Sequence, residues 1–197
     1  MSHQRSAISN PHKTVFLDRD GVINADSPDY IKCWAEFHFI PGSLDAIARL
    51  THSGCSVIVI TNQSVINRRW VSLAELETMH RKLRQAVCDS GGRITDIFYC
   101  PHRPDEGCGC RKPKPGLIFA ARDRYGIDLS RAVMVGDSAK DILAGQAAGC
   151  GRTVLVQTGN GMTAIQVLEE TGQRPDHVAA NLDRAAQWIL DRPSLRP

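Results

Sequence analysis

Residues 15–21 read Val-Phe-Leu-Asp-Arg-Asp-Gly, three apolar residues followed at once by two carboxylates and a glycine. The apolar triplet predicts a short buried strand, and Gly21 lets the chain turn sharply after it. Asp18 and Asp20 are two residues apart on extended backbone, so both can face one site beyond the strand end. Taken alone, the pattern fits a polar loop as well as it fits a catalytic site.

Short β-rich runs alternate with helical stretches along the rest of the chain, a pattern typical of a parallel sheet flanked by helices. We expect a single domain over residues 1–197, with its core at about 14–190, folded as a Rossmann-like α/β three-layer sandwich with a central, mostly parallel sheet and no large cap domain. Irregular segments at 25–41 and 101–113 are too long for plain connectors, so we expect them to carry function. The expected strands are 15–17, 57–60, 97–99, 132–135, 153–156 and 177–179, and the expected helices are 43–52, 72–90, 115–126, 139–148 and 182–190.

Composition excludes several classes of protein. The 197 residues carry a net charge of +3, with 42% hydrophobic and 23% charged residues, as in ordinary globular domains. The longest strongly apolar run, 57–60, is far shorter than the ~20 residues of a membrane span, and the first thirteen residues lack the apolar core of a secretory signal. We therefore expect a cytoplasmic protein with no membrane partner, and the small net charge gives no argument for nucleic acid.

Polar residues also follow three other parts of the expected sheet, where open α/β sheets bind their ligands. Residues 61–64, TNQS, offer a hydroxyl, two amides and turn N–H groups to phosphate oxygens. Asp137 and Asp141, one helical turn apart, offer carboxylates to Mg²⁺, although aspartates at such positions also cap helices. Residues 111–116, RKPKPG, place three cations ahead of a helix, which suits an anion unless the loop is merely solvated.

Four soft metal ligands fall within eleven residues: Cys100, His102, Cys108 and Cys110. Three sulfurs and one imidazole form a closed tetrahedral set typical of structural zinc, and without an export signal a disulfide framework is not expected. Reduced thiols, or a redox pair of Cys108 and Cys110, are the alternatives. We predict a zinc loop over 100–110. The other cysteines and histidines are expected to be structural, Cys55 and Cys150 as small buried residues and His12, His52 and His80 at the surface.

In their order along the chain, the four strand-end motifs resemble those of the haloacid dehalogenase (HAD)-like phosphohydrolases, whose fold is a Rossmann-like α/β sheet. The resemblance covers about residues 14–157. It implies that Asp18 is the nucleophile, which attacks phosphorus and forms an aspartyl-phosphate. It implies that Asp20 is the general acid that protonates the leaving oxygen, and then the base that activates water.

The same resemblance assigns the charge-stabilising groups. Thr61 and Lys112 would stabilise the transferring phosphoryl group. A catalytic Mg²⁺ would bring the phosphate and the nucleophile together. Its implied ligands are Asp18, the backbone carbonyl of Asp20 and Asp137, with Asp141 acting through water.

The segments YCPH and CGCRKPKPG, together with FLDRDGVIN and TNQS, are similar to one branch of that superfamily. This branch is the D-glycero-D-manno-heptose 1,7-bisphosphate phosphatases, capless, Mg²⁺-dependent and zinc-containing enzymes that remove the C7 phosphate during synthesis of activated heptose for lipopolysaccharide. The similarity implies a small-molecule sugar bisphosphate as substrate, and we expect a monomer. The implied substrate contacts are Arg111, for recognition, and Asp26, Asn62, Gln63 and Ser64.

The basic residues suit this substrate, because two phosphate monoesters carry up to about −4 near neutral pH. Arg68 and Arg69 either hold the distal phosphate or lie on a solvated face, and the sequence leaves both open. The chain departs from the branch at Val65 and near Arg69, where glycine is common, and the segment at 26–34 is one residue longer than expected. Because these changes border the sugar site, the pattern does not fix the preferred anomer.

Three other functions were weighed against this one. Histidinol-phosphate phosphatases share the nucleophile and the zinc loop, but their amine-bearing substrate favours an acidic contact over a second cationic one. A DNA 3′-phosphate would need a basic groove, which a charge of +3 does not support. A non-catalytic zinc-stabilised interaction module would be favoured by loss of any one of the four main catalytic residues. All four are present: Asp18, Asp20, Lys112 and Asp137.

Overall fold

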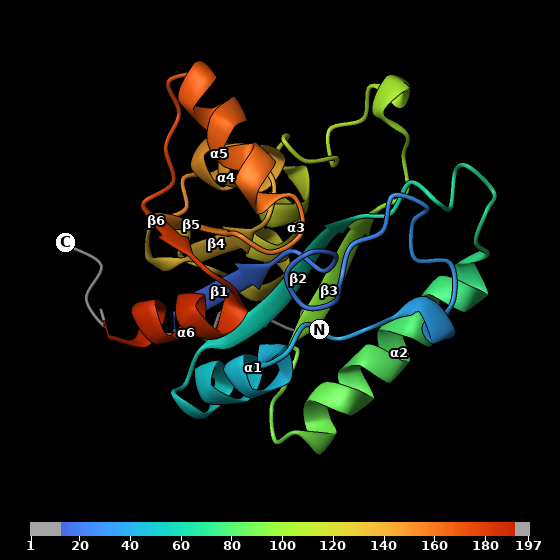
Figure 1. The fold of residues 1–197 in the computed structure, drawn as a ribbon, viewed down its shortest axis with the longest axis horizontal. Helices are drawn as coiled ribbons and strands as arrows, with labels where there is room; N and C mark the ends of the chain where they lie inside the picture. Colours follow the sequence, from blue (N-terminus) through green and yellow to red (C-terminus); the bar gives the residue numbers. More distant parts are fainter. Residues whose placement is uncertain (1–12, 192–197) are drawn as a thin grey trace, which may run out of the picture.

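A six-stranded parallel sheet forms the centre of the molecule (Figure 1). The computed structural model describes residues 13–191, so His12 lies outside the described part. The strands are β1 (Thr14–Leu17), β2 (Ser56–Asn62), β3 (Asp96–Cys100), β4 (Val133–Gly136), β5 (Arg152–Val156) and β6 (His177–Ala179). Their order is β3-β2-β1-β4-β5-β6, and every pairing is parallel, which confirms the expected α/β sheet.

Helices cover both faces of the sheet and complete the predicted three layers. In β1, Val15 and Leu17 pack on one face and Phe16 on the other, as alternation along a strand requires. Residues 13–191 contain no helix with the length and apolar character that a membrane span needs. One face carries α1 (Ser43–His52), α2 (Leu73–Asp89) and α6 (Leu182–Leu190), and the other carries α3 (Gly116–Tyr125), α4 (Ala139–Ala148) and α5 (Gly161–Glu170) (Figure 1).

Capping residues explain why several helix ends could be predicted from the sequence. The Ser72 hydroxyl accepts a hydrogen bond from the Glu75 N–H at 3.1 Å, so α2 starts where the predicted capping motif put it. Ser138 and Asp141 cap each other at the start of α4. Helices α1, α4 and α6 have the expected bounds.

Helix α5 corrects the sequence analysis, which predicts no helix between β5 and β6. No side-chain cap marks its start at Asn160, although its buried residues Gly161, Ala164 and Leu168 follow the i, i+3, i+7 spacing of one helix face. Met162 and Val167 are exposed, at 61% and 42%. The helix rests on a small satellite core made with α4 and β5, which only the tertiary structure supplies.

The long connections rise from the carboxyl ends of the first three strands. Their only helical pieces are the short 3₁₀ turns η1 (Trp34–Glu36) and η2 (Pro104–Glu106), and a third turn, η3 (Leu129–Arg131), precedes β4. No separate cap domain therefore covers this edge of the sheet within the described residues. β1 and β4 are adjacent although distant in sequence, and folds of this kind bind ligands in the crevice outside the carboxyl ends of two such strands.

Candidate active site

Asp18 stands at this crevice, directly after β1. The backbone extends the sheet by one more hydrogen bond, from the Asp18 N–H to the Val135 carbonyl at 2.9 Å. The carboxylate accepts the Arg19 N–H at 2.7 Å. Burial raises the pKa of Asp18 well above its usual value, and the charges of Asp141 and Asp137 add to the shift while Lys112 opposes it. A nearby positive charge is therefore required to stabilise the ionised form of this carboxylate.

Lys112 supplies one such cation from the loop before α3. Its ammonium lies 2.8 Å from Asp18 Oδ1 and 2.6 Å from Asp141 Oδ1, and donates to the Ile60 carbonyl at 2.8 Å. The side chain is only 2% exposed. Burial alone would lower its pKa, but the two carboxylates raise it well above the usual range, so the charge is fixed.

Three carboxylates meet beside that lysine. One oxygen each from Asp18, Asp137 and Asp141 lies within 4.8 Å of the others. Burial and the charge of Asp141 raise the pKa of Asp137 to about 6. Gly21 and Gly159 press so closely on the Asp137 carboxylate that a Cβ on either would collide with it. Hard oxygen ligands packed this tightly, with more negative charge than Lys112 can balance, fit a small divalent cation such as Mg²⁺.

Asn160 holds the Asp137 carboxylate in place. Its backbone N–H donates to Asp137 Oδ2 at 2.8 Å, and its side-chain amide donates to the same atom at 3.1 Å. The amide also donates to Asp26 Oδ2 at 2.8 Å, so the predicted substrate contact Asp26 is tied to the acidic cluster. Sequence reasoning missed Asn160 because it lies at the start of α5, the helix that was not predicted.

Asp20 is the centre of a buried polar network. The Arg19 guanidinium contacts both Asp20 oxygens, at 2.9 to 3.1 Å, although Arg19 itself is fully buried. Asn24 and Gln63 each donate one further hydrogen bond to the carboxylate. Burial would raise the pKa of Asp20, but the Arg19 charge and these hydrogen bonds bring it below its usual value. The network therefore fixes the orientation of both carboxylate oxygens.

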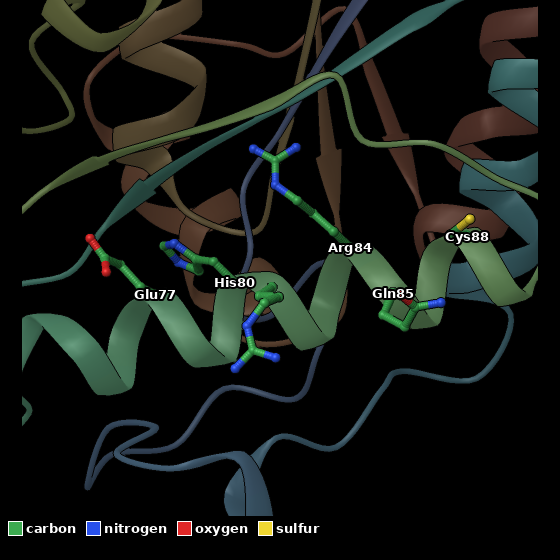
Figure 2. A pocket seen from close by; sticks show the side chains of 6 residues that line it. Glu77, His80, Arg84, Gln85 and Cys88 are labelled. Carbon is green, nitrogen blue, oxygen red and sulfur yellow. The ribbon is translucent and has the colours of Figure 1, made fainter.

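His80 extends this network, which corrects the expectation that it lies at the surface. It is 8% exposed, and its Nε2 lies 3.4 Å from Arg19 Nη1. Figure 2 shows His80 and Arg84 projecting from the same side of α2, where they line a pocket of about 450 Å³. Burial and the charges of Arg19 and Arg84 lower the pKa of His80 to about 3, so the ring is neutral. The sequence signal was available, because His80 follows Leu76 by four residues and shares its buried helix face.

The residues after β2 are held by the elements around them. Gln63 donates to Thr61 Oγ1 at 2.9 Å as well as to Asp20, so the predicted phosphoryl stabiliser Thr61 lies beside the predicted general acid. The Asn62 side chain exchanges two hydrogen bonds with the Lys112 backbone, at 3.1 and 3.2 Å. Ser64 is buried at 2% exposure. The roles of Asn62, Gln63 and Ser64 as substrate contacts stay predictions, but their positions bring β2 and the lysine loop to the same site.

The four predicted zinc ligands converge in the loop between β3 and α3. The three Sγ–Sγ distances are 3.2 to 3.6 Å, and His102 Nδ1 lies 3.5 Å from Cys100 Sγ and 3.3 Å from Cys110 Sγ. A tetrahedron with 2.3 Å metal–sulfur bonds has edges of about 3.8 Å, so the set fits one ion closely. The next residue, Arg111, donates to the His102 carbonyl at 3.1 Å. Of the other two cysteines considered, Cys55 is buried as expected, whereas Cys150 is half-buried.

Comparisons with known proteins place these features in a family. A family model described as HAD-hydrolase-like matches residues 109–185. The chain is 52% identical over 151 residues to D-glycero-β-D-manno-heptose-1,7-bisphosphate 7-phosphatase from Pseudomonas aeruginosa, covering 77% of this chain and 84% of the relative. The Escherichia coli enzyme of the same name is 40% identical over 184 residues, which is 90% of this chain and 87% of the relative.

A solved structure agrees with the sequence relatives. The D,D-heptose 1,7-bisphosphate phosphatase from Bordetella bronchiseptica, crystallised with magnesium and phosphate, is 42% identical and superposes with a TM-score of 0.85. The match covers 91% of this chain and 99% of that one. The chain therefore belongs to the D-glycero-β-D-manno-heptose-1,7-bisphosphate 7-phosphatase family of HAD-like hydrolases.

Proposed function

We propose that this chain is a Mg²⁺-dependent phosphatase that removes the C7 phosphate of D-glycero-β-D-manno-heptose 1,7-bisphosphate. The observation that carries the proposal is the Asp18–Lys112–Asp141 cluster, with the Asp20 carboxylate fixed beside it. Relatives at 40% to 52% identity are named for this reaction, and their names support both the β anomer and cleavage at C7.

The chemistry follows from the positions of two carboxylates. Asp18 attacks the C7 phosphorus, so that an O–P bond forms while the bond between phosphorus and the C7 oxygen breaks. The negative charge of a bound phosphate favours protonation of Asp20, which gives that proton to the leaving oxygen and later takes a proton from the water that hydrolyses the aspartyl-phosphate. Lys112 neutralises charge on the phosphoryl oxygens, and the Thr61 hydroxyl donates to them. Arg19 and Gln63 donate to Asp20 Oδ2 and so fix the orientation of this carboxylate for both proton transfers.

The acidic cluster would hold the catalytic Mg²⁺. Asp18, Asp137 and the Asp20 backbone carbonyl would be direct ligands, with Asp141 acting through water. When bound, the ion supplies the positive charge that lets a phosphate dianion approach the Asp18 carboxylate. Asn160 fixes one Asp137 oxygen, so it acts as a positioning residue for this group.

The cysteine loop would hold a structural Zn²⁺ through Cys100, His102, Cys108 and Cys110. All four ligand atoms converge in a segment with little other apolar support, so the ion would order the loop. Because Cys110 directly precedes Arg111, an ordered loop keeps the substrate-recognition residue in place.

Replacing Cys108 by alanine tests this structural role. We expect the purified variant to carry less than one zinc per chain, to melt at a lower temperature, and to lose activity through disorder of the Arg111 loop. Metal analysis and a thermal melt are the measurements. Cys88→Ala, at an exposed cysteine outside the cluster, is the matched control. Full activity in wild-type protein that contains no zinc would contradict the proposal.

The substrate assignment is tested by phosphate release. The α and β anomers of heptose 1,7-bisphosphate and histidinol phosphate are compared with and without Mg²⁺, with Asp18→Asn as the blank. We expect the β anomer to be turned over fastest, with one phosphate released per molecule. Faster release from histidinol phosphate would mean that the enzyme is a histidinol-phosphate phosphatase. No release above the blank would reject the heptose assignment.

A further inference from the structure

Arg68, in the connection after β2, lies against two aromatic rings, and its backbone N–H donates to the Ser64 carbonyl at 3.0 Å. The Cζ of Arg68 lies 5.7 Å from the centre of the Tyr30 ring and 5.2 Å from the centre of the Trp70 ring. The two rings also contact each other edge to face, with centroids 5.3 Å apart. We call these three residues the Arg68 clamp. Cation–π contacts hold the guanidinium in one place without neutralising its charge.

Arg68 has no anionic partner. Within residues 13–191 its side chain makes no ion pair and no hydrogen bond, and its Nε is buried without a partner. Leaving a buried donor unpaired is unfavourable, and more so when the group is charged. A guanidinium whose position is already fixed loses little entropy when it binds, and its in-plane N–H groups match two oxygens of a phosphate. The clamp therefore has the properties of a prepared anion contact.

Of the other cations near the site, Arg69 and Lys140 are exposed, and the rest already have partners within residues 13–191. Lys112 is bound to Asp18 and Asp141 at the reacting end. Arg19 is bound to Asp20 and shielded from solvent. Arg103 forms ion pairs with Asp105 and Glu106. Lys114 donates to the Gly107 and Cys108 carbonyls, and Arg111 donates to the His102 carbonyl.

The clamp is built from the two loops that frame the site. Tyr30 belongs to the connection after β1, which carries Asp18, and Arg68 and Trp70 belong to the connection after β2, which carries Thr61. These two connections run beside each other near the start of α2 (Figure 1). The second is fastened to the zinc loop, where Asn67 donates to Glu106 at 2.7 Å. The neighbouring Arg69 is exposed, has a backbone φ of 59°, and forms no cation–π pair within residues 13–191, where Arg68 forms two.

We propose that Arg68, held by Tyr30 and Trp70, binds the second phosphate of the substrate, the one on C1 that is not removed. This inference rests on the proposed function. A bisphosphate brings up to about −4 to the site, and the acidic cluster that serves the reacting phosphate cannot also bind the distal one. A fixed cation on the rim gives the bisphosphate an advantage over a monophosphate of the same sugar.

The test compares two substrates in the Arg68→Gln variant. For heptose 1,7-bisphosphate we expect kcat/KM to fall roughly 10- to 100-fold, the usual value of a hydrogen bond to a charged group. For heptose 7-phosphate, which lacks the distal phosphate, kcat/KM should stay within about twofold. Inhibition by the product heptose 1-phosphate should weaken by the same factor as bisphosphate turnover, while inhibition by inorganic phosphate should not change. Arg93→Gln, at an exposed arginine beyond the end of α2, is the matched control.

Two further variants keep the test independent of folding. Arg68→Lys keeps the charge but loses the planar fork, so we expect a partial loss confined to the bisphosphate. Arg69→Gln should have no selective effect. Equal losses on both substrates in Arg68→Gln, no loss on either, or a selective loss in Arg69→Gln would each overturn the assignment. If the wild type does not cleave the bisphosphate at all, the proposed function fails, and this inference fails with it.

Discussion

Asp18→Asn is expected to lower kcat by roughly 10⁴- to 10⁶-fold, the scale seen when a covalent nucleophile is removed from other enzymes. The amide keeps the size of the side chain and can still accept the Arg19 N–H, so the backbone after β1 should not move. It cannot attack phosphorus at a useful rate, and no aspartyl-phosphate can form. Single-turnover phosphate release from the bisphosphate, with Mg²⁺ present, is the measurement.

Stability separates a lost nucleophile from a misfolded chain. The pKa of Asp18 is raised by burial and by its acidic neighbours, so in metal-free protein the ionised carboxylate destabilises the fold at neutral pH. Asn removes that charge, and the metal-free variant should therefore melt no lower than the wild type. Asp123→Asn, at an exposed position on α3, should change neither activity nor melting. If Asp18→Asn keeps a tenth of the activity, Asp18 is not the nucleophile.

The residues that converge at the candidate site were predictable because each follows a strand. Val15–Leu17 and 57–60 have the apolar runs of central strands, and parallel strands bring their carboxyl ends to the same edge. Asp18 and Asp137 are therefore adjacent although they lie 119 positions apart along the chain. The proposed zinc ligands could be predicted for a different reason. All four lie within eleven residues, so no tertiary information is needed to bring them together.

The supporting residues could not be predicted, because their roles arise only from contacts distant in sequence. The sequence assigns no role to Arg19 between the two aspartates, and only the fold, which brings His80 and Gln63 to it, makes it a buried partner of Asp20. Asn160 acquires its role from Asp137 and Asp26, which lie 23 and 134 residues away. The sequence alone does not distinguish Arg68 from Arg69, the two arginines after β2. The ring contacts made by Arg68 alone separate them.

Lys112→Met carries the second large expectation, a loss of both activity and stability. The apolar side chain fills the buried space but removes the cation that two carboxylates and the Ile60 carbonyl share. Removing one partner of a buried ion pair costs about 3–5 kcal/mol, which urea unfolding of the Mg²⁺-free protein would measure. Loss of one preorganised charge-stabilising group should lower kcat about 10²- to 10³-fold when Mg²⁺ is present. Lys82→Met, at an exposed lysine on α2, should show neither effect.

The pH dependence of that instability tests its electrostatic origin. Replacing Lys112 removes the charge that opposes the upward shift in the pKa of Asp18, so this group in the folded state binds its proton more tightly than the unfolded chain does. Such a group stabilises the fold below its unfolded pKa and loses that contribution as the pH rises toward its folded pKa. The gap in unfolding free energy between variant and wild type should therefore be small near about pH 4 and large near about pH 8. A gap that is the same at both values would mean that the lysine contributes packing alone, and its assignment to the phosphoryl site would lose its physical basis.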